Sequence, residues 1–354
     1  MHTTSTVRVW GAPAACLLVC SALALVAGAG EPAAEDHPPE VQSVSFTLEQ
    51  FVQAVLQNHL DLELPTLGAD ARRTTTRRTG GGIVVRPAER LGRLDEFNFR
   101  ETVNRVLFGA IEAYWRQVLR VGKAEILERA AARAEQDARL ARVRAGAAGG
   151  PLPAAMAETF LQERRFALHR ARQDMLTGED RLKLALNDEM IRVDSDTRLL
   201  LRTEAPERFG GEDFDVTDGV RTAEEYRLAP DVARVAQVEA RTDKVTRRRV
   251  EEMALEVKSA WRQVTDARTR LGLSRKYVAA AEDALEAADE KAEEAGGRIT
   301  AEFLLVKHRA DEALTRAETE LLAAEVEYQI ALAAWYRATG ELHEKWNVEL
   351  SLRD

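Results

Sequence analysis

The stretch from Val250 to Ala295 reads VEEMALEVKSAWRQVTDARTRLGLSRKYVAAAEDALEAADEKAEEA and contains no proline and a single glycine, Gly272. Two sets of residues recur along it at every seventh position. The first set is mostly large and apolar: Val250, Val257, Val264, Leu271, Val278, Leu285 and Ala292. The second set, three residues further on, is mostly small: Met253, Ala260, Ala267, Ser274, Ala281, Ala288 and Ala295. Such spacing forms the seam of a coiled coil, so it predicts one long helix after Pro230.

A second stretch with the same period follows the Gly296-Gly297 turn. Its large residues lie seven apart: Leu314, Leu321, Tyr328 and Trp335. Beside them runs a row of alanines: Ala310, Ala317, Ala324, Ala331 and Ala338. A strict seven-residue period favours left-handed supercoiling, and alanine allows helices to approach closely. The two stretches therefore predict an antiparallel helical hairpin.

The sequence of the hairpin occurs twice in the chain. Trp115–Val118 (WRQV) recurs as Trp261–Val264, at an offset of 146 residues. Leu184–Leu186 (LAL) recurs as Ile330–Leu332 (IAL) at the same offset. Matches in the same order within two helical hairpins indicate an internal repeat. The sequence therefore predicts an all-α fold made by tandem duplication of a long, antiparallel coiled-coil hairpin.

This pattern divides the chain into segments. A first helix is expected from Phe46 to Leu64, with Thr47 as its cap, and the first hairpin from Phe97 to Gly146 and from Ala154 to Asn187. The expected segments are a signal peptide (1–29), a disordered lead-in (30–45), a first hairpin repeat (46–187, irregular at 65–98), a connector (188–222), a second hairpin repeat (223–340) and a C-terminal tail (341–354).

The N-terminal residues predict export. An apolar run from Ala14 to Val26 ends on Ala27-Gly28-Ala29, which fits the A-x-A pattern of a signal peptidase site. The run is too short for a membrane-spanning helix, which needs roughly 20 residues. Cys16 and Cys20 both lie in this segment. Cleavage would remove them, so neither a disulfide nor thiol chemistry is expected of the mature chain.

Composition excludes several function classes. The net charge of −9 argues against a nucleic-acid binder, which needs a basic face toward the phosphates. A charged fraction of 31% argues against a polytopic helical membrane protein. The abundance of Ala, Arg, Glu and Leu is typical of long helices.

Residues with potential for chemistry have simpler explanations. His343-Glu344-x-x-Asn347 lacks the second histidine of the zinc motif H-E-x-x-H. His308 and Glu312 share a helix face, but zinc needs a third ligand, so a surface or seam contact is expected. Gly80–Gly82 is interpreted as a linker and Arg72–Arg78 as a solvated loop. No catalytic residue, cofactor or metal is therefore expected, and the chain is not expected to be an enzyme.

Three motifs resemble those of the TolC-like outer-membrane efflux protein family. Phe46-Thr47-Leu48-Glu49 through Asn58-His59-Leu60-Asp61-Leu62 is similar to the opening helix of that family. Leu228-Ala229-Pro230-Asp231-Val232 resembles the R-P-D-L that opens its second repeat. Gly297-Arg298-Ile299-Thr300-Ala301-Glu302-Phe303-Leu304-Leu305 resembles its tip turn, G-x-[IVLT]-x-x-x-[DEF]-L-L. The resemblance covers about residues 46–345.

The resemblance implies a function and partners. In that family, three copies form a helical tunnel through the periplasm, and the hairpin tips meet a periplasmic adaptor and an inner-membrane pump. By this resemblance the chain is expected to be a passive efflux or secretion duct, a homotrimer in the outer membrane or periplasm of a two-membrane bacterium. The expected partner-binding residues are those at the tips: Gly150, Leu152, Gly296, Gly297, Arg298, Ile299, Thr300 and Phe303. An alternative is that Leu152 and Ile299 only plug the end of the seam.

The sequence departs from the family at the membrane-spanning strands. Such strands need about 9–11 residues of alternating polarity. Residues 65–98 offer one short candidate, Ile83–Val85, and Val232–Lys258 contains no Gly or Pro at which strands would turn. Little or no β-barrel is therefore expected. The second hypothesis is a periplasmic coiled-coil scaffold or adaptor without a pore. A third, enzymatic hypothesis would require histidines and carboxylates to meet in space.

Overall fold

The computed structural model describes residues 43–58, 74–79, 82–87, 93–144, 151–202, 213–227, 244–294 and 300–350. The expected signal peptide and residues 30–42 of the expected lead-in lie outside these ranges. The elements are β1 (Ser43–Phe46), α1 (Leu48–Asn58), β2 (Thr74–Thr79), β3 (Gly82–Pro87), α2 (Arg93–Arg144), α3 (Pro151–Leu186), β4 (Arg198–Leu201), α4 (Val216–Arg227), α6 (Lys244–Glu294), α7 (Ala301–Thr339), α8 (Leu342–Lys345) and β5 (Val348–Leu350).

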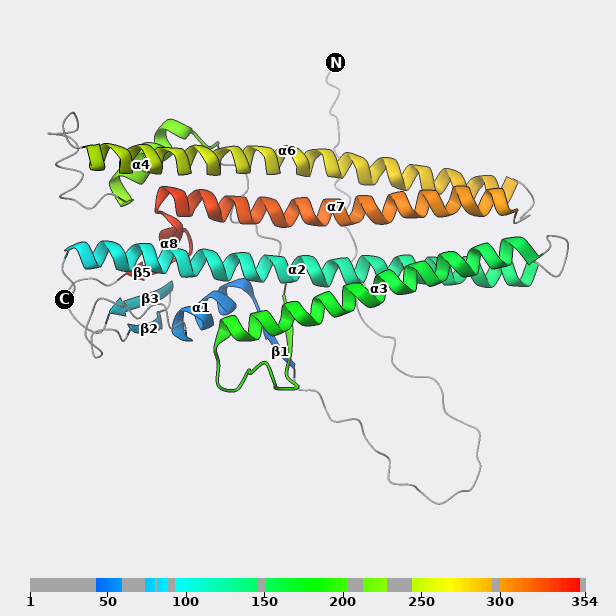
Figure 1. Ribbon diagram of the computed structural model, residues 1–354, viewed down its shortest axis with the longest axis horizontal. Coiled ribbons are helices and arrows are strands. Elements are labelled where there is room, and N and C mark those ends of the chain that lie inside the picture. The colour runs from blue at the N-terminus through cyan, green and yellow to red at the C-terminus, as the bar shows by residue number, and fades with distance from the viewer. Residues whose placement is uncertain are drawn as a thin grey trace, which may run out of the picture. The chain divides into compact units, whose positions relative to one another are not determined.

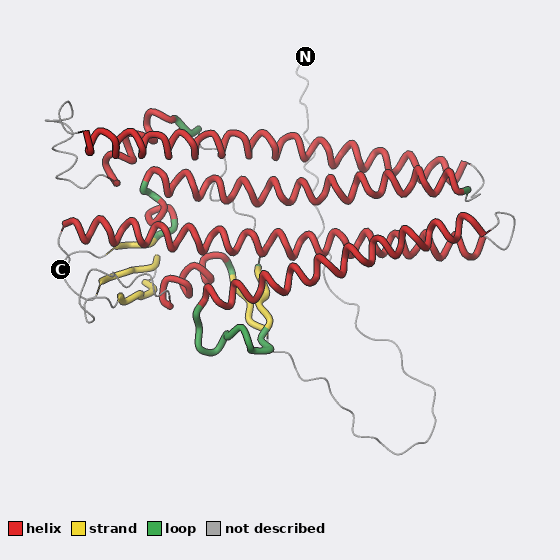
Figure 2. Tube along the Cα trace, viewed as in Figure 1, coloured by secondary structure: helices red, strands yellow, loops and turns green. Residues whose placement is uncertain are grey.

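Four long helices make up most of the described structure, and they lie in the order α3, α2, α7, α6 (Figure 1). Helices α2 and α3 form one antiparallel hairpin and α6 and α7 form the other. The hairpins meet where α2 packs along α7. Figure 2 shows how little of the described chain is strand. The predicted fold class, duplicated long helical hairpins with few strands, is confirmed.

The seven-residue seam is the buried face of α6. Its buried residues are Met253, Val257, Ala260, Val264, Ala267, Ala281 and Ala288, all members of the two predicted sets. Helix α7 buries Leu314, Trp335 and the alanines at 317, 324, 331 and 338. The predicted pairing of these stretches is therefore confirmed. The described part of α6 begins at Lys244, so residues 230–243 of the predicted helix lie outside the described residues.

The short helix α1 is fixed by a reciprocal cap. The Thr47 hydroxyl accepts from the Gln50 backbone N–H at 3.2 Å, and the Gln50 side-chain oxygen accepts from the Thr47 N–H at 3.0 Å. This is a capping box, and it confirms Thr47 as the cap. Phe46 was expected inside the helix, but it ends β1, which pairs in parallel with β4. The correction follows from the cap, because a residue before the N-cap lies outside the helix.

The duplication includes a second short helix that the sequence analysis did not expect. Residues 188–222 were expected to be an irregular connector, but they contain β4 and the start of α4. Helix α4 packs on α6 as α1 packs on α2. A carbonyl near the start of each short helix lies close to an aromatic side chain of the long helix. The Tyr114 hydroxyl donates to the Arg202 carbonyl at 2.8 Å and lies 3.4 Å from the Phe46 carbonyl oxygen, and the Trp261 indole N–H donates to the Phe214 carbonyl at 3.0 Å.

The described parts of residues 65–98 are more regular than expected. Strands β2 and β3 form an antiparallel hairpin in which Thr79 lies opposite Gly82, and α2 begins at Arg93 rather than at Phe97. Part of the Arg72–Arg78 segment is therefore strand and not loop. The candidate strand Ile83–Val85 lies within β3. The threonines of β2 explain the strand, since β-branched residues favour an extended backbone.

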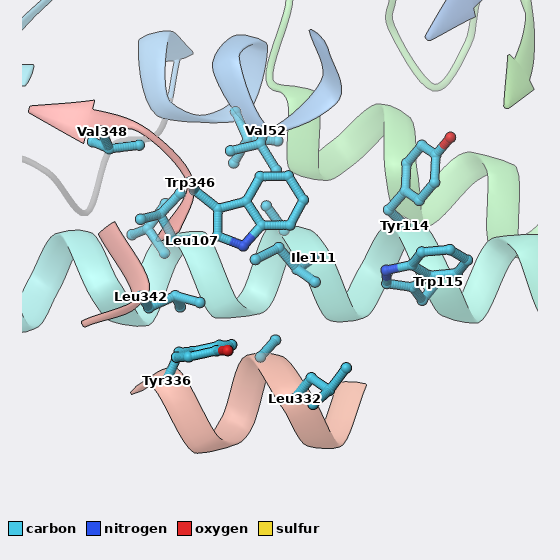
Figure 3. Close-up of a cluster of buried hydrophobic side chains, with 14 of the residues drawn as sticks. Val52, Leu107, Ile111, Tyr114, Trp115, Leu332, Tyr336, Leu342, Trp346 and Val348 are labelled. Atoms are coloured by element: carbon cyan, nitrogen blue, oxygen red, sulfur yellow. The ribbon is translucent and has the colours of Figure 1, made fainter. Parts of the chain in front are cut away.

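Residues 341–350 belong to the core, although they were expected to be part of a tail. Gly340 ends α7 in the left-handed region (φ 88°), and the chain then turns back toward α2. Leu342, Trp346 and Val348 are buried among side chains of α1, α2 and α7 (Figure 3). Strand β5 pairs in parallel with β3, so Val348 lies opposite Ile83. The turn at Gly340 is what makes this return possible, because glycine adopts positive φ at little cost.

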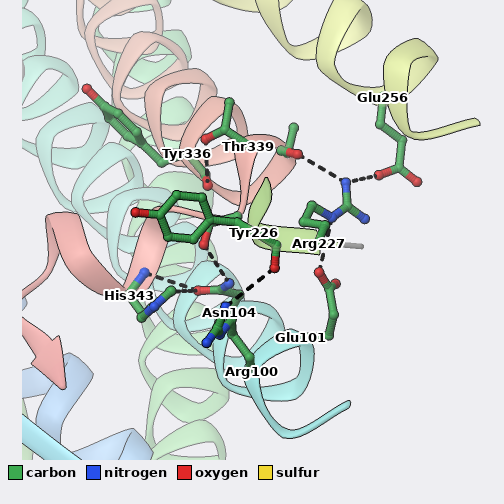
Figure 4. Close-up of polar contacts among 11 residues, drawn as sticks. Arg100, Glu101, Asn104, Tyr226, Arg227, Glu256, Tyr336, Thr339 and His343 are labelled. Carbon is green, nitrogen blue, oxygen red and sulfur yellow. Dashed lines mark hydrogen bonds and ion pairs between the residues drawn. The ribbon is translucent and has the colours of Figure 1, made fainter. Parts of the chain in front are cut away.

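A polar network fastens this end of the molecule (Figure 4). Arg227 of α4 forms ion pairs with Glu101 of α2 at 3.0 Å and Glu256 of α6 at 2.6 Å, and it donates to the Ala338 carbonyl at 3.1 Å. Burial alone would lower the pKa of Arg227, but the two carboxylates raise it. One side chain thus joins both hairpins and the end of α7.

Buried His343 joins the same region. The Asn104 side-chain oxygen accepts from the His343 backbone N–H at 3.1 Å and lies 3.2 Å from its Nδ1, while the Asn104 amide donates to the Gly340 carbonyl at 3.2 Å. Burial, with a smaller contribution from Arg100, lowers the pKa of His343 to about 4. The imidazole is therefore neutral in the native protein at neutral pH, and it holds the turn after α7.

We expect stability to fall as pH drops from about 6.5 to about 4, because the unfolded chain then binds a proton at His343 that the native state excludes. The loss attributable to His343 is about 3 kcal/mol. Urea unfolding at pH 7.5, 6, 5 and 4.5 measures it. The matched variant His343→Gln keeps a donor toward Asn104 without titrating, so its stability should fall less over this range. Equal slopes for the two proteins would contradict the assignment.

No helix in the described part of the chain is both long enough and apolar enough to span a lipid bilayer.

Candidate functional site

The two hairpins have their turns at the same end, where α2 leads to α3 and α6 leads to α7 (Figure 1). Helix α3 begins at Pro151, as suits a residue without a backbone N–H in the first turn. Leu152 follows with 61% of its surface exposed. Most of this side chain is therefore exposed in the described structure, and its partner-binding role stays a prediction.

The second tip is described only from Thr300 onward. Thr300 caps α7, its hydroxyl accepting from the Phe303 N–H at 3.1 Å. Phe303 is partly buried against a small cluster of α2, α3 and α7 residues: Ala138, Ala141, Ala157, Leu161 and Leu304. Thr300 is exposed and fixes the start of α7, and Phe303 packs against the tip cluster; a partner-binding role for either residue stays a prediction. Gly150 and residues 296–299 (Gly296, Gly297, Arg298 and Ile299) lie outside the described residues, and their partner-binding role stays a prediction.

Just behind the tips, a carboxylate lies between two arginines. Asp311 of α7 forms ion pairs with Arg133 of α2 at 2.5 Å and with Arg164 of α3 at 3.2 Å. The side chains of Asp311 and Arg164 are only 10% and 11% exposed. Water screens such a pair poorly, so removing one partner leaves an uncompensated charge in a poorly hydrated place. This contact ties both helices of the first hairpin to the second hairpin.

One turn closer to the tip, Lys307 repeats the pattern with opposite signs. Its ammonium lies 2.9 Å from Asp137 of α2 and 2.9 Å from Asp289 of α6. Burial alone would lower the pKa of Lys307, but hydrogen bonds to the two carboxylates raise it. Burial also raises the pKa of Asp137, and Lys307 opposes that shift. Asp311 and Lys307 thus connect α7 to each of the other three long helices.

His308 takes part by packing. Its ring stacks on Phe160 of α3, with centroids 3.7 Å apart and planes 1° from parallel, and its Nε2 lies 3.9 Å from a Glu163 oxygen. Burial and the nearby Arg164 lower the pKa of His308. This is the seam contact that the sequence analysis expected. In the ranges that the structure describes, no three His, Cys, Asp or Glu residues are arranged to hold a metal ion.

This charged layer was not predicted from the sequence, although a signal was present. Asp311 follows Leu304 by seven residues and precedes Leu314 by three, so it falls on the buried face of α7. A carboxylate at such a position needs cationic neighbours. Which cations these are depends on the packing of α7 against the first hairpin, and the seam pattern within one hairpin does not contain that information.

We expect Asp311→Ala to lower the free energy of unfolding by about 3 kcal/mol, because Arg164 then keeps a buried charge without its carboxylate. The matched control is Glu312→Ala. Its partner Arg316 is 64% exposed, and such pairs contribute about 0.5 kcal/mol or less. Urea unfolding of both variants measures the difference. Similar losses in the two variants would contradict a structural role for Asp311.

Comparison with models of known protein families finds no match to this sequence, and comparison with curated proteins finds none. Comparison with solved structures does find similar chains. A membrane protein from Pseudomonas aeruginosa is 14% identical, with 87% of this chain and 91% of that chain covered at a TM-score of 0.58. The CmeC outer membrane channel of Campylobacter jejuni is 13% identical, with 74% and 70% covered at a TM-score of 0.54.

The outer membrane protein VceC of Vibrio cholerae is also similar, with 13% identity, 70% of this chain and 72% of that chain covered, and a TM-score of 0.51. Identities this low establish likeness of fold. The chain has the TolC-like fold that its sequence motifs predicted.

Proposed function

We propose that this protein is a wall subunit of a passive efflux or secretion duct, assembled from several copies and joined to other export components at its hairpin tips. The observation that carries the proposal is the open layer of four long helices. Helices α2 and α7 have a long helix on both sides, whereas α3 and α6 are the outer helices. A closed wall can be built from copies of such a layer, because the outer helices on its two edges can each contact a neighbouring copy.

The charges on the outer faces fit a water-filled path. The chain has 31% charged residues, and the exposed faces of the long helices carry many of them. A duct needs no catalytic group, because solutes move through it by diffusion or under force from a pump. The buried charges at Asp311 and Lys307 serve the wall instead, since they hold the two hairpins of one copy together.

The tips are the proposed contact for a periplasmic adaptor, which would connect the duct to an inner-membrane pump. Support comes from Leu152, an apolar side chain left exposed beside the first turn. Two proteins that share the fold are described as an outer membrane channel, CmeC, and as an outer membrane protein, VceC. For this chain we propose export, a place in the outer membrane or periplasm of a two-membrane bacterium, and a homotrimer.

The mass of the exported chain tests the proposal. Purified with and without detergent, the protein should have the mass of a closed oligomer, three copies in the simplest case, by light scattering. Fractionation of the native host should place it with the outer membrane or the periplasm.

A monomer at all protein concentrations, with and without detergent, would contradict the duct. A soluble dimer would also contradict it and would favour a periplasmic scaffold. A substitution at Leu152 should leave formation of the closed oligomer unchanged, because the tips lie outside the proposed contacts between copies. That variant separates assembly from adaptor binding.

A further inference from the structure

We propose that the contact between α2 and α3 carries an anion-binding site, in which Arg120 and Arg181 hold a phosphate or carboxylate group with Lys123 beside them. The inference rests on the proposed function and deepens it, since it names acidic solutes as a cargo that the duct wall attracts. Guanidinium groups suit such a ligand, because their planar forks match the paired oxygens of phosphates and carboxylates.

Arg120 is positioned across the contact between the two helices. Its Nη1 donates to the side-chain oxygen of buried Gln117 at 3.4 Å, and the Gln117 amide donates to the Met175 carbonyl of α3 at 2.9 Å. The Arg120 side chain also lies over Gly178 of α3, where a Cβ would come within 2.7 Å of its Cδ and 2.9 Å of its Nη1. A side chain that is already placed loses less conformational entropy when it binds a ligand.

Positive charge gathers around Arg120 without enough carboxylates to balance it. Burial lowers the pKa of Arg120, the neighbouring Arg181 and Arg116 lower it further, and Asp174 opposes them. Arg116 has a carboxylate of its own, since it forms an ion pair with Glu112 at 2.7 Å. Within the described ranges, neither Arg120 nor Arg181 forms an ion pair. An acidic group of a solute would supply the missing negative charge.

The basic side chains lie on the face of α2 that α1 leaves free. Tyr114 points toward α1, where its ring centroid lies 5.8 Å from that of Phe51. At about 100° per residue, Lys123 lies about 180° around α2 from Tyr114, and Arg116 lies about 160° from it. Lys123, Arg116 and Arg181 are all exposed. A wall whose path stays clear has α1 on its outside, so these basic side chains would face the path.

The second hairpin lacks this arrangement at the equivalent place. At the offset of 146 residues, the counterparts of Arg120, Gly178 and Arg181 are Asp266, Ala324 and Glu327. Asp266 and Glu327 both form ion pairs with Arg270, at 3.0 and 3.1 Å, so charges of both signs meet there. The whole chain has a net charge of −9, so the positive excess on the first hairpin is local. Neither the seam nor the duplication accounts for it.

Binding of inorganic pyrophosphate to the full exported chain tests the site. Isothermal titration calorimetry at low NaCl should give a Kd of about 1 mM or tighter, and citrate should compete. Arg120→Gln and Arg181→Gln should each raise the Kd about tenfold, because each removes a charged donor from the anion. The matched control is Arg262→Gln, since Arg262 is the exposed counterpart of Arg116 in the second hairpin. It should change the Kd less than about twofold.

A further variant separates a positioned site from general positive charge. Gly178→Ala keeps every charge but places a Cβ in the space that the Arg120 side chain occupies, so Arg120 must move. We expect the Kd for pyrophosphate to rise about fivefold. Far-UV circular dichroism and the melting temperature check that each variant is folded.

A protein that binds no pyrophosphate, or binds it equally well after Arg120→Gln and Arg181→Gln, would overturn the site and leave the duct in place. Unchanged binding by Gly178→Ala would overturn the positioning of Arg120. Light scattering on the same samples separates the two proposals. A chain that binds pyrophosphate as expected but stays monomeric would keep the anion site and overturn its place in a duct wall.

Discussion

A seven-residue apolar repeat imposes one constraint on two helices, namely that they stay in contact along their whole length. In α6 and α7 this contact is made mainly by alanines and valines, such as Ala260, Val264 and Ala317. Small side chains bring the backbones close, and close backbones leave little tolerance for bends or shifts in register. The length of the hairpin, the position of its turn and the faces left over for other contacts all follow from that seam.

Contacts between the hairpins follow a different rule. Within a hairpin the helices are joined mainly by apolar side chains, whereas near the tips α7 is joined to the first hairpin by the buried charges of Asp311 and Lys307 as well. At the other end Arg227 joins α4 to both α2 and α6. Partly buried charges contribute little net stability but penalise any arrangement that separates them. They therefore fix how one hairpin sits against the other, which the apolar surfaces alone specify only loosely.

Much of the fold was predictable because periodicity is a local property of the sequence. The seam and the Thr47 cap depend on residues close together in the chain, and the duplication shows as short motifs that recur 146 residues apart; the structure contains all three. The positions at which the two repeats differ in structure were not predictable. Gln117 is buried and donates to the Met175 carbonyl at 2.9 Å, whereas its counterpart Gln263 is exposed. Equivalent positions of the two hairpins therefore differ in burial and in hydrogen bonding.

The charged layer and residues 341–350 depend on distant partners, and this is why the sequence pattern missed them. Trp346 and Val348 look like part of a polar tail when only their neighbours are considered, yet they are buried against residues from α1 and α2. Their environment is set by the nearby turn at Gly340 and by β3, which lies more than 250 residues earlier in the chain. Similarly, the internal repeat predicts where the tip residues lie, but it does not predict which residues of a partner molecule they would contact.

The pairing of β5 with β3 also constrains the order in which the chain is assembled. Strand β3 lies near the start of the described chain and β5 near its close, so their contact has one of the largest sequence separations in the fold. A contact of this kind forms late, since the intervening chain must first be brought together. If the protein crosses a membrane N-terminus first, the β2–β3 hairpin must wait without its third strand until both helical hairpins have followed. The small sheet can then be completed only after β5 has crossed the membrane. A chain whose translocation stops earlier exposes an unpaired strand edge to chaperones and proteases.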